Sequence, residues 1–144
     1  MSNLNIDKSL SVILIIVLIL LIAGTIKIIV FPQPSEKFTE FYILGPNGNA
    51  SDYPTNLTAG ESGNVTIGIV NHEYTNTTYR LIIKINQTIL KNETITLSDN
   101  EKKEIPFTFK PTAAWNNQKI EFLLFKPPGN STAYRSLYLL MNVH

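Results

Sequence analysis

The chain opens with one long apolar run and continues with short segments in which apolar and polar residues alternate. The run covers residues 10–31, and Lys27 is its only charged residue. A helix of this length, at about 1.5 Å per residue, can cross the roughly 30 Å apolar core of a bilayer, and a lysine near its end can reach the interface. Pro32 and Pro34 then end the helix. The pattern predicts a transmembrane helix over residues 10–31 in contact with the lipid bilayer.

Two other interpretations of the apolar run stay open. Ala23 and Gly24 are small residues of the kind found at signal-peptide cleavage sites, although the run is longer than the ~7–15 residues of a usual signal core. A prepilin-like leader cut near Lys8 and Ser9 would instead leave an apolar helix that packs into a filament. Ser9 is not the glycine or alanine usual before such a cut. The length of the apolar run therefore favours an uncleaved membrane anchor.

Downstream of this run the alternation has a period of two, which is typical of strands with one buried face. Val65, Ile67 and Ile69, for example, share a face. The strand candidates are residues 38–44, 64–70, 79–85, 93–97, 104–109, 119–125 and 134–143. Seven such strands separated by turn signals, with no helical pattern among them, predict an all-β fold. We expect an immunoglobulin-like or fibronectin-III-like β-sandwich over residues 38–144.

The strand patterns also predict a core, an edge and a turn. The expected core consists of Val65, Ile67, Ile69, Leu81, Ile83, Phe107, Phe109, Phe122, Leu124, Leu139 and Met141. Pro106 cannot donate to a strand ladder, so its strand should lie at an edge or carry a bulge. Residues 71–78 are rich in Asn and Thr, which favours a turn between two adjacent strands of a hairpin.

Composition removes several classes of function. The net charge of +1 over 144 residues gives no basic patch for nucleic acid. Because the chain contains no cysteine, it can form neither a disulfide framework nor a zinc–thiolate site. A small domain without disulfides has to be stabilised by its own core, by partners or by a membrane tether.

Asn-x-Ser/Thr triplets bear on the side of the membrane that the domain faces. Chance placement of 15 Asn and 23 Ser and Thr residues would give roughly two such triplets. The chain has seven, all after the apolar run: Asn49, Asn56, Asn64, Asn76, Asn86, Asn92 and Asn130. Strands favour Thr and turns favour Asn, and these preferences alone could also raise the number of triplets. We expect a cytoplasmic N-terminus at residues 1–9, a Pro-containing linker at 32–37 and an extracellular, N-glycosylated domain.

Polar and aromatic residues near strand ends are the candidate binding residues, because loops and strand ends gather at the ends of a sandwich. They are Tyr53, Asn71, His72, Glu73, Trp115 and Arg135. Tyrosine and arginine suit contacts with a sugar ring or a partner protein. A structural alternative is that Glu40 or Glu73 pairs with Arg135 while the tyrosines cap the sandwich. Trp115 is either a residue of the core or an exposed anchor in a loop, and the two asparagines that follow it favour the exposed position.

Little in the sequence points to catalysis. His72 and His144 are the two histidines, so a three-His zinc site is excluded. Neighbouring positions of a strand point to opposite faces, which would separate His72 from Glu73 unless both lie in a turn. No nucleophile elbow, phosphate-binding glycine loop or calcium loop occurs. We expect no enzyme, no cofactor and no metal, with an accessory domain of a hydrolase or transferase as a remote alternative.

Several local motifs occur together in an order that chance rarely produces. They are Thr-Glu-Phe-Tyr, Gly-Pro, Tyr-Pro-x-Asn-Leu, Gly-Glu, Val-Asn-His-Glu and Tyr-Arg. In this order they resemble the signature of domain of unknown function 1616, a family of mostly archaeal predicted membrane proteins, over about residues 38–143. Many members of that family carry several spans before this domain, whereas here there is one. The resemblance implies a membrane location and the β-domain, and it implies no activity.

These observations favour a non-catalytic, membrane-anchored protein of the cell envelope. Its outward-facing domain would contact an envelope protein or a surface glycan, and self-association is a further option. The alternative is a structural subunit of a filament or membrane complex that packs through its N-terminal helix. Lys27 within the apolar run gives that alternative some support, because a partner's carboxylate would explain the charge.

Overall fold

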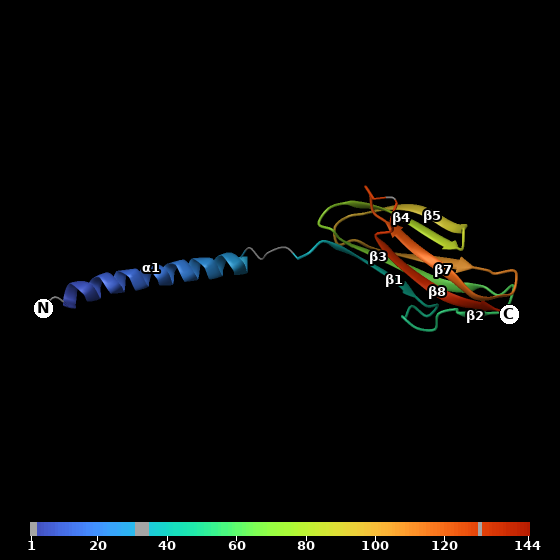
Figure 1. Cartoon of the computed structure of the whole chain (residues 1–144), viewed down its shortest axis with the longest axis horizontal. Coiled ribbons are helices and arrows are strands. Elements are labelled where there is room, and N and C mark those ends of the chain that lie inside the picture. Colours follow the sequence, from blue (N-terminus) through green and yellow to red (C-terminus); the bar gives the residue numbers. More distant parts are fainter. Residues whose placement is uncertain (1–2, 31–34, 130) are drawn as a thin grey trace. The chain divides into compact units, whose positions relative to one another are not determined.

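The structure is a computed structural model, and it describes residues 3–30, 35–129 and 131–144. The chain divides into two compact units, Met1–Glu36 and Lys37–His144. The first holds a single helix, α1 (Asn3–Val30), and the second holds all the strands (Figure 1).

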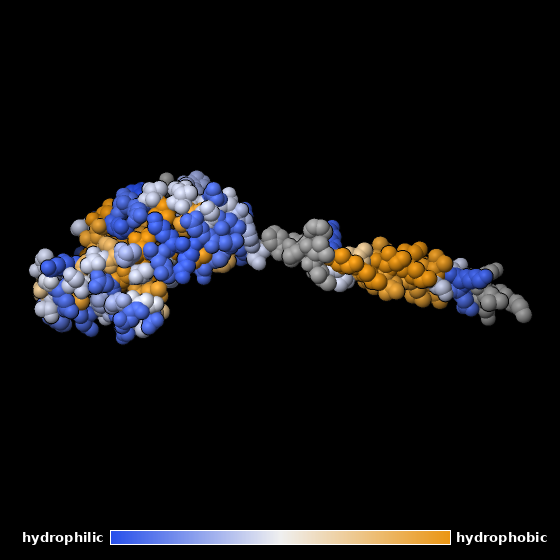
Figure 2. Space-filling view, turned by 180° about the vertical axis from the view of Figure 1, so that it is seen from behind, coloured by the Kyte–Doolittle hydropathy of each residue, from blue (hydrophilic) through white to orange (hydrophobic). Residues whose placement is uncertain are grey.

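The apolar side chains of helix α1 do not gather on one face, and the side seen in Figure 2 is hydrophobic along most of the helix. Residues 7–27 are exposed, and Asp7–Lys27 form one segment of 21 residues that is long and apolar enough to cross a membrane. A helix of a soluble domain would instead bury one face. The predicted end of the helix at Phe31 and the prolines Pro32 and Pro34 lie outside the described residues.

The second unit is a sandwich of two sheets. Its strands are β1 (Phe38–Leu44), β2 (Asn56–Leu57), β3 (Gly63–His72), β4 (Thr77–Ile85), β5 (Thr88–Leu97), β6 (Lys102–Phe109), β7 (Trp115–Phe125) and β8 (Arg135–Val143). One sheet has the order β1-β3-β6 and the other the order β2-β8-β7-β4-β5. All pairs are antiparallel except β2 with β8. The expected all-β sandwich with an N-terminal helix is confirmed.

One predicted connection is wrong. Residues 71–78 were expected to form a hairpin, but β3 and β4 lie in different sheets and do not pair. The segment between them therefore crosses from one sheet to the other. The hairpin lies one strand later, where β4 and β5 pair through a short turn at Asn86. The edge position expected for Pro106 is confirmed, because β6 ends its sheet.

The core lies between the sheets and matches most of the expected residues. Of the predicted set, Phe107 and Leu139 are only half-buried, although both pack against the core, and the rest are buried. The structure adds the fully buried Tyr79 and Ile120. The two-residue strand β2 had no signal in the alternation, because two residues are too few to show a period.

On the outer face of the three-stranded sheet a tyrosine covers a glycine. Tyr42 of β1 stands opposite Gly68 of β3, and a Cβ atom at position 68 would overlap the Tyr42 ring. The Tyr42 hydroxyl donates to Glu104 Oε1 of β6 at 3.0 Å, and Lys102 Nζ lies 3.1 Å from the same oxygen. The side chain of Tyr42 thus bridges all three strands above Gly68.

Candidate functional site

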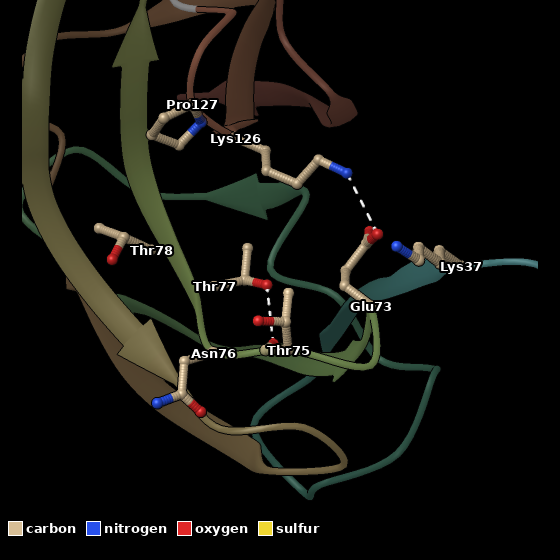
Figure 3. A pocket seen from close by; sticks show the side chains of 8 residues that line it. All are labelled: Lys37, Glu73, Thr75, Asn76, Thr77, Thr78, Lys126 and Pro127. Carbon is tan, nitrogen blue, oxygen red and sulfur yellow. Dashed lines mark hydrogen bonds and ion pairs between the residues drawn. The ribbon is translucent and has the colours of Figure 1, made fainter.

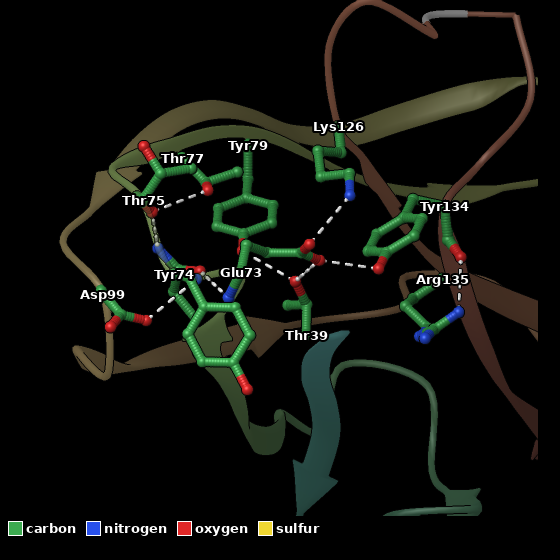
Figure 4. A network of polar contacts seen from close by, with 11 residues as sticks. Thr39, Glu73, Tyr74, Thr75, Thr77, Tyr79, Asp99, Lys126, Tyr134 and Arg135 are labelled. Carbon is green, nitrogen blue, oxygen red and sulfur yellow. Dashed lines mark hydrogen bonds and ion pairs between the residues drawn. The ribbon is translucent and has the colours of Figure 1, made fainter. Parts of the chain in front are cut away.

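One end of the sandwich gathers a cluster of polar side chains around Glu73. At this end β1 begins, and the chain enters the domain there. The β3–β4, β5–β6 and β7–β8 connections lie at the same end, because those strands alternate in direction. We refer to it as the entry end, and to the opposite end as the far end. Figure 4 shows Thr39 of β1, Glu73 and Tyr134 converging there.

Glu73 follows β3 directly and points into the sandwich, where it is only 4% exposed. Its Oε1 accepts hydrogen bonds from the Thr39 hydroxyl at 2.9 Å and from the Tyr134 hydroxyl at 2.7 Å. Its Oε2 lies 3.2 Å from Lys126 Nζ (Figure 4). The Thr39 hydroxyl is also 2.7 Å from that of the buried Tyr79. A buried carboxylate needs such partners, since an unpaired charge would be costly there.

These partners keep both members of the ion pair charged. Burial acts to raise the pKa of Glu73, but the hydrogen bonds from Tyr134, Thr39 and Lys126 outweigh it and leave the pKa lowered. Burial likewise acts to lower the pKa of Lys126, and the hydrogen bond to Glu73 outweighs it and leaves the pKa raised. Burial raises the pKa of Tyr79. The site holds a fixed charge pair and not a base ready to take a proton.

Arg135 does not pair with either expected carboxylate. Lys126, which directly follows β7, takes the position beside Glu73. Arg135 donates from Nη1 to the Tyr134 carbonyl at 3.2 Å, and its guanidinium carbon lies 4.5 Å from the centre of the Tyr134 ring. Lys126 Nζ lies 4.1 Å from the same ring centre. The expected pairing of Glu40 or Glu73 with Arg135 is therefore wrong, and cation–π contacts replace it.

His72 lies on the outer face of the same end and has separate partners. Its Nε2 donates to Glu40 Oε2 at 2.8 Å, and its Nδ1 lies 3.3 Å from Asn100 Oδ1. Its ring stacks on Phe38 with centroids 4.6 Å apart. The hydrogen bond to Glu40 is the main reason that the pKa of His72 is raised. His72 and Glu73 thus point to opposite sides and share no partner, as neighbouring strand positions do.

Asn71 holds the crossing segment to the rest of the domain. The side chain is fully buried, and its Nδ2 donates to the carbonyls of Thr75, Leu97 and Ser98 at 2.8–3.1 Å. Its Oδ1 accepts from the Glu73 backbone N–H at 2.8 Å. Both ends of its amide group are hydrogen-bonded to the backbone inside the domain, so its role in this structure is to fix the backbone around Glu73.

Tyr53 and Trp115 lie away from this cluster. Tyr53 follows β1 and donates from its hydroxyl to the Ile43 carbonyl at 2.8 Å. Trp115 is the first residue of β7 at the far end, where its ring packs half-buried against the core. Its expected exposure in a loop is therefore wrong. Among the described residues its buried Nε1 has no hydrogen-bond partner.

The structure also adds residues that sequence reasoning missed. Lys126 and Thr39 complete the partners of Glu73, although neither stood out in the sequence. A signal for Lys126 does exist, because it directly follows a strand that ends at the entry end and precedes Pro127 and Pro128. For Thr39 there is none, since it is one threonine among many in a strand.

An open cavity of about 310 Å³ lies beside the Glu73 cluster (Figure 3). Its lining is mostly polar: Lys37, Glu73, Thr75, Asn76, Thr77, Thr78, Lys126 and Pro127. Among the described residues no three His, Asp or Glu side chains come together as a metal site. Hydroxyl, amide and ammonium groups in a shallow cavity can hydrogen-bond a polar ligand.

A family model matches residues 32–142, and its description is "Domain of unknown function (DUF1616)". The chain belongs to the DUF1616 family. The match covers the sandwich except for Val143, the last residue of β8, and it confirms the resemblance seen in the motifs. It includes every residue of the Glu73 cluster. Among curated proteins no relative matches this DUF1616 chain.

Solved structures share the fold of the DUF1616 domain at low sequence identity. The CARDB domain of a Pyrococcus furiosus protein, crystallised with di-metal ions, is 15% identical with a TM-score of 0.58, over 79% of this chain and 98% of that one. A chain of the human seminal-plasma complex of zinc 2-glycoprotein and prolactin-inducible protein is 7% identical with a TM-score of 0.56, over 76% and 98%. These likenesses show a shared immunoglobulin-like sandwich.

Proposed function

We propose that this DUF1616 protein is a non-catalytic, single-pass protein of the cell envelope that presents its sandwich outside the cell for contacts with a protein or a glycan. One observation carries the proposal. An apolar helix with no polar face precedes a domain that has its own closed core. The helix exposes apolar side chains that lipid has to cover, whereas the domain buries its apolar side chains in its own core and can be surrounded by water.

The triplet asparagines support the outward orientation. Asn49, Asn56, Asn64, Asn76, Asn86 and Asn92 are all exposed in the folded domain, and Asn130 lies outside the described residues. An exposed acceptor asparagine is what glycosylation of a folded surface needs.

The entry end supports contact and argues against catalysis. Glu73 is held charged by three donors, and Asn71 is fully used by the backbone, so neither is available to a reaction. The cavity beside them offers Thr75, Thr78 and Asn76 at its exposed rim (Figure 3). These groups suit the hydroxyls of a sugar or the backbone of a partner. The di-metal ions belong to the CARDB domain, and among the described residues of this chain no three His, Asp or Glu side chains come together.

The absence of cysteine makes the orientation easy to test. Single cysteines introduced by Ser2→Cys and Ser62→Cys lie before the helix and in the domain, respectively. A membrane-impermeant maleimide added to intact cells should label the Ser62→Cys protein at once and the Ser2→Cys protein only after lysis. The reverse order would overturn the orientation, and labelling of both in the soluble fraction would overturn the anchor.

Contact and processing are tested on the same protein. Deleting residues 37–144 while keeping the helix should alter envelope assembly or adhesion and abolish no enzymatic activity. The intact mass of the full chain should exceed the sequence mass by the mass of attached glycans. A ladder of self-cross-linked chains with an amino terminus cut near Ser9 would replace this function with the filament subunit. Loss of a hydrolytic or transfer activity would replace it with an enzyme.

A further inference from the structure

Strand β8 leaves most of one edge without a partner. On one side it pairs with β7 along its length, and on the other it pairs with β2 only at Asn142 and Val143. No other described strand pairs with residues 135–141 on that side. A row of backbone groups without partners at a sheet edge is a template for an added strand.

The direction of the free backbone groups follows from the β2 contact. The Asn142 N–H donates to the Thr55 carbonyl at 2.8 Å, so Asn142 faces the β2 side. Backbone groups in a strand alternate between its two sides. Ser136, Tyr138 and Leu140 therefore present their N–H and C=O groups on that same side, beyond the end of β2.

Two of the other edge strands, β5 and β6, carry features that discourage strand addition. Edge strand β6 contains Lys102, Lys103 and Pro106, and edge strand β5 contains the ion pair of Lys91 and Glu93. Lysines and prolines are the usual means by which a sheet edge avoids pairing. Residues 136–141 of β8 hold no charge and no proline. Tyr138 and Leu140 are moreover 60% and 50% exposed, the largest exposure of apolar side chains in the domain apart from Ile89.

An apolar cavity runs beside this edge. Its volume is about 370 Å³, and it lies where β8 faces β1 across the open side of the sandwich. Phe41, Ile43, Tyr53, Leu137 and Leu139 are among its lining residues. An added strand directs every second side chain toward the space between the sheets. Apolar side chains at these alternate positions would fill the cavity.

The positive charge of Arg135 indicates which kind of segment binds at the free edge of β8. The guanidinium of Arg135 is exposed at the start of the free edge, and no described carboxylate forms an ion pair with it. A partner with an acidic residue at that end would complement it. A second copy of β8 would not, because two antiparallel β8 strands centred on Tyr138 place Arg135 opposite the apolar Met141.

We propose that the free edge of β8 binds an extended segment of another protein by strand addition, with alternate apolar side chains in the β1–β8 cavity and an acidic residue beside Arg135. The main-chain bonds to Ser136, Tyr138 and Leu140 supply the alignment, and the cavity supplies selectivity for apolar side chains. Arg135 lies at the entry end but does not line the cavity at Glu73, and the rest of this surface runs along β8 away from that end, so the protein partner does not depend on that cavity.

The test uses the full chain in nanodiscs and a fluorescent eight-residue peptide of alternating valine and threonine with aspartate at one end. Tyr138→Pro removes one N–H from the free edge and leaves the β7 side intact, whereas the matched Tyr138→Thr keeps that N–H. We expect Tyr138→Pro to weaken binding by about tenfold or more and Tyr138→Thr by less than about threefold. Equal binding by the two variants would overturn strand addition.

Two further measurements keep the proposal testable if Tyr138→Pro does not fold. The amides of Tyr138 and Leu140 should exchange rapidly in the free protein and become protected when the peptide binds. Arg135→Glu should weaken binding of the aspartate peptide several-fold and strengthen binding of the same peptide with lysine in its place. Absence of protection, or indifference to the charge swap, would overturn the assignment. A dimer of the chain alone that protects the same amides would replace the foreign segment with a second copy.

Discussion

Glu73 shows how a single buried charge organises the entry end. Its carboxylate draws together Thr39 from β1, Tyr134 from the start of β8 and Lys126 from the end of β7. These segments belong to both sheets, so the charge pair joins the sandwich across its core. Such a buried ion pair adds little stability compared with well-packed apolar side chains in its place. Removing one member is nevertheless costly, because the other charge is then left buried without a partner.

Replacing Glu73 with glutamine should therefore destabilise the domain. Glu73→Gln leaves Lys126 without its counter-charge, and we expect a loss of about 2–4 kcal/mol in the free energy of unfolding. The control is Glu121→Gln, which breaks the longer, partly exposed pairs with Lys84 and Lys119 and should cost about 0–1 kcal/mol. Urea denaturation measures both. Because the pKa of Glu73 is lowered by folding, its contribution is present above its ordinary pKa of 4.5 and is lost as the pH falls. Similar losses of unfolding free energy in Glu73→Gln and Glu121→Gln would contradict the larger contribution of the Glu73–Lys126 pair.

His72 gives the same end a pH response of opposite sign. Folding raises its pKa above the ordinary 6.5, mainly through the hydrogen bond to Glu40. Its contribution to stability is therefore complete below about pH 6.5 and is lost as the pH rises through the raised value. Glu40→Gln should shift the NMR titration of the His72 ring to lower pH. A titration that does not move would show that Glu40 does not set this pKa.

At the scale of elements, the alternation of apolar and polar residues was enough to predict seven of the eight strands and most of the core. It was not enough to predict which strands pair. The stretch around Asn76 has the length and composition of a hairpin turn, yet Asn71 ties it to the carbonyls of Leu97 and Ser98 at the β5–β6 connection. These hydrogen bonds join residues that are far apart in the sequence, so the local alternation of apolar and polar residues cannot reveal them.

The pairing of β1 with β3 depends on a glycine beneath an aromatic ring. Gly68→Ala should destabilise the domain by about 1–3 kcal/mol, because the added methyl group overlaps the Tyr42 ring. Tyr42→Ala removes that ring, so Gly68→Ala should cost far less in the Tyr42→Ala background. A double-mutant cycle followed by thermal unfolding measures the coupling. Additive effects of the two changes would exclude a clash between them.

At the scale of the whole molecule, the helix and the β-domain are two separate compact units. The apolar run was recognisable because Asp7–Lys27 is long and apolar enough to cross a membrane, and length and composition are visible in the sequence. The candidate site was only partly recognisable. Asn71, His72, Glu73 and Arg135 do gather at one end, but Lys126 and not Arg135 pairs with Glu73, since pairing depends on where loops place a side chain.

The separation predicts that residues 37–144 fold without the helix. Expressed alone, this segment should be soluble and monomeric and should unfold at a temperature within a few degrees of the full chain's domain transition, because the core lies entirely inside it. Calorimetry of both proteins measures the two transitions. A fragment that aggregates or melts far earlier would show that the helix contributes to the stability of the domain.

The alternation of strand directions has a mechanical consequence. The tether enters at the start of β1, whereas β8 runs from that end to the far end. A partner that pulls on the far end therefore loads the domain along its strands. The seven paired positions of β1 and β3 would then be sheared together instead of opening one after another. Ladders loaded in this direction resist force collectively, so the domain should extend little under tension between the membrane and whatever it holds.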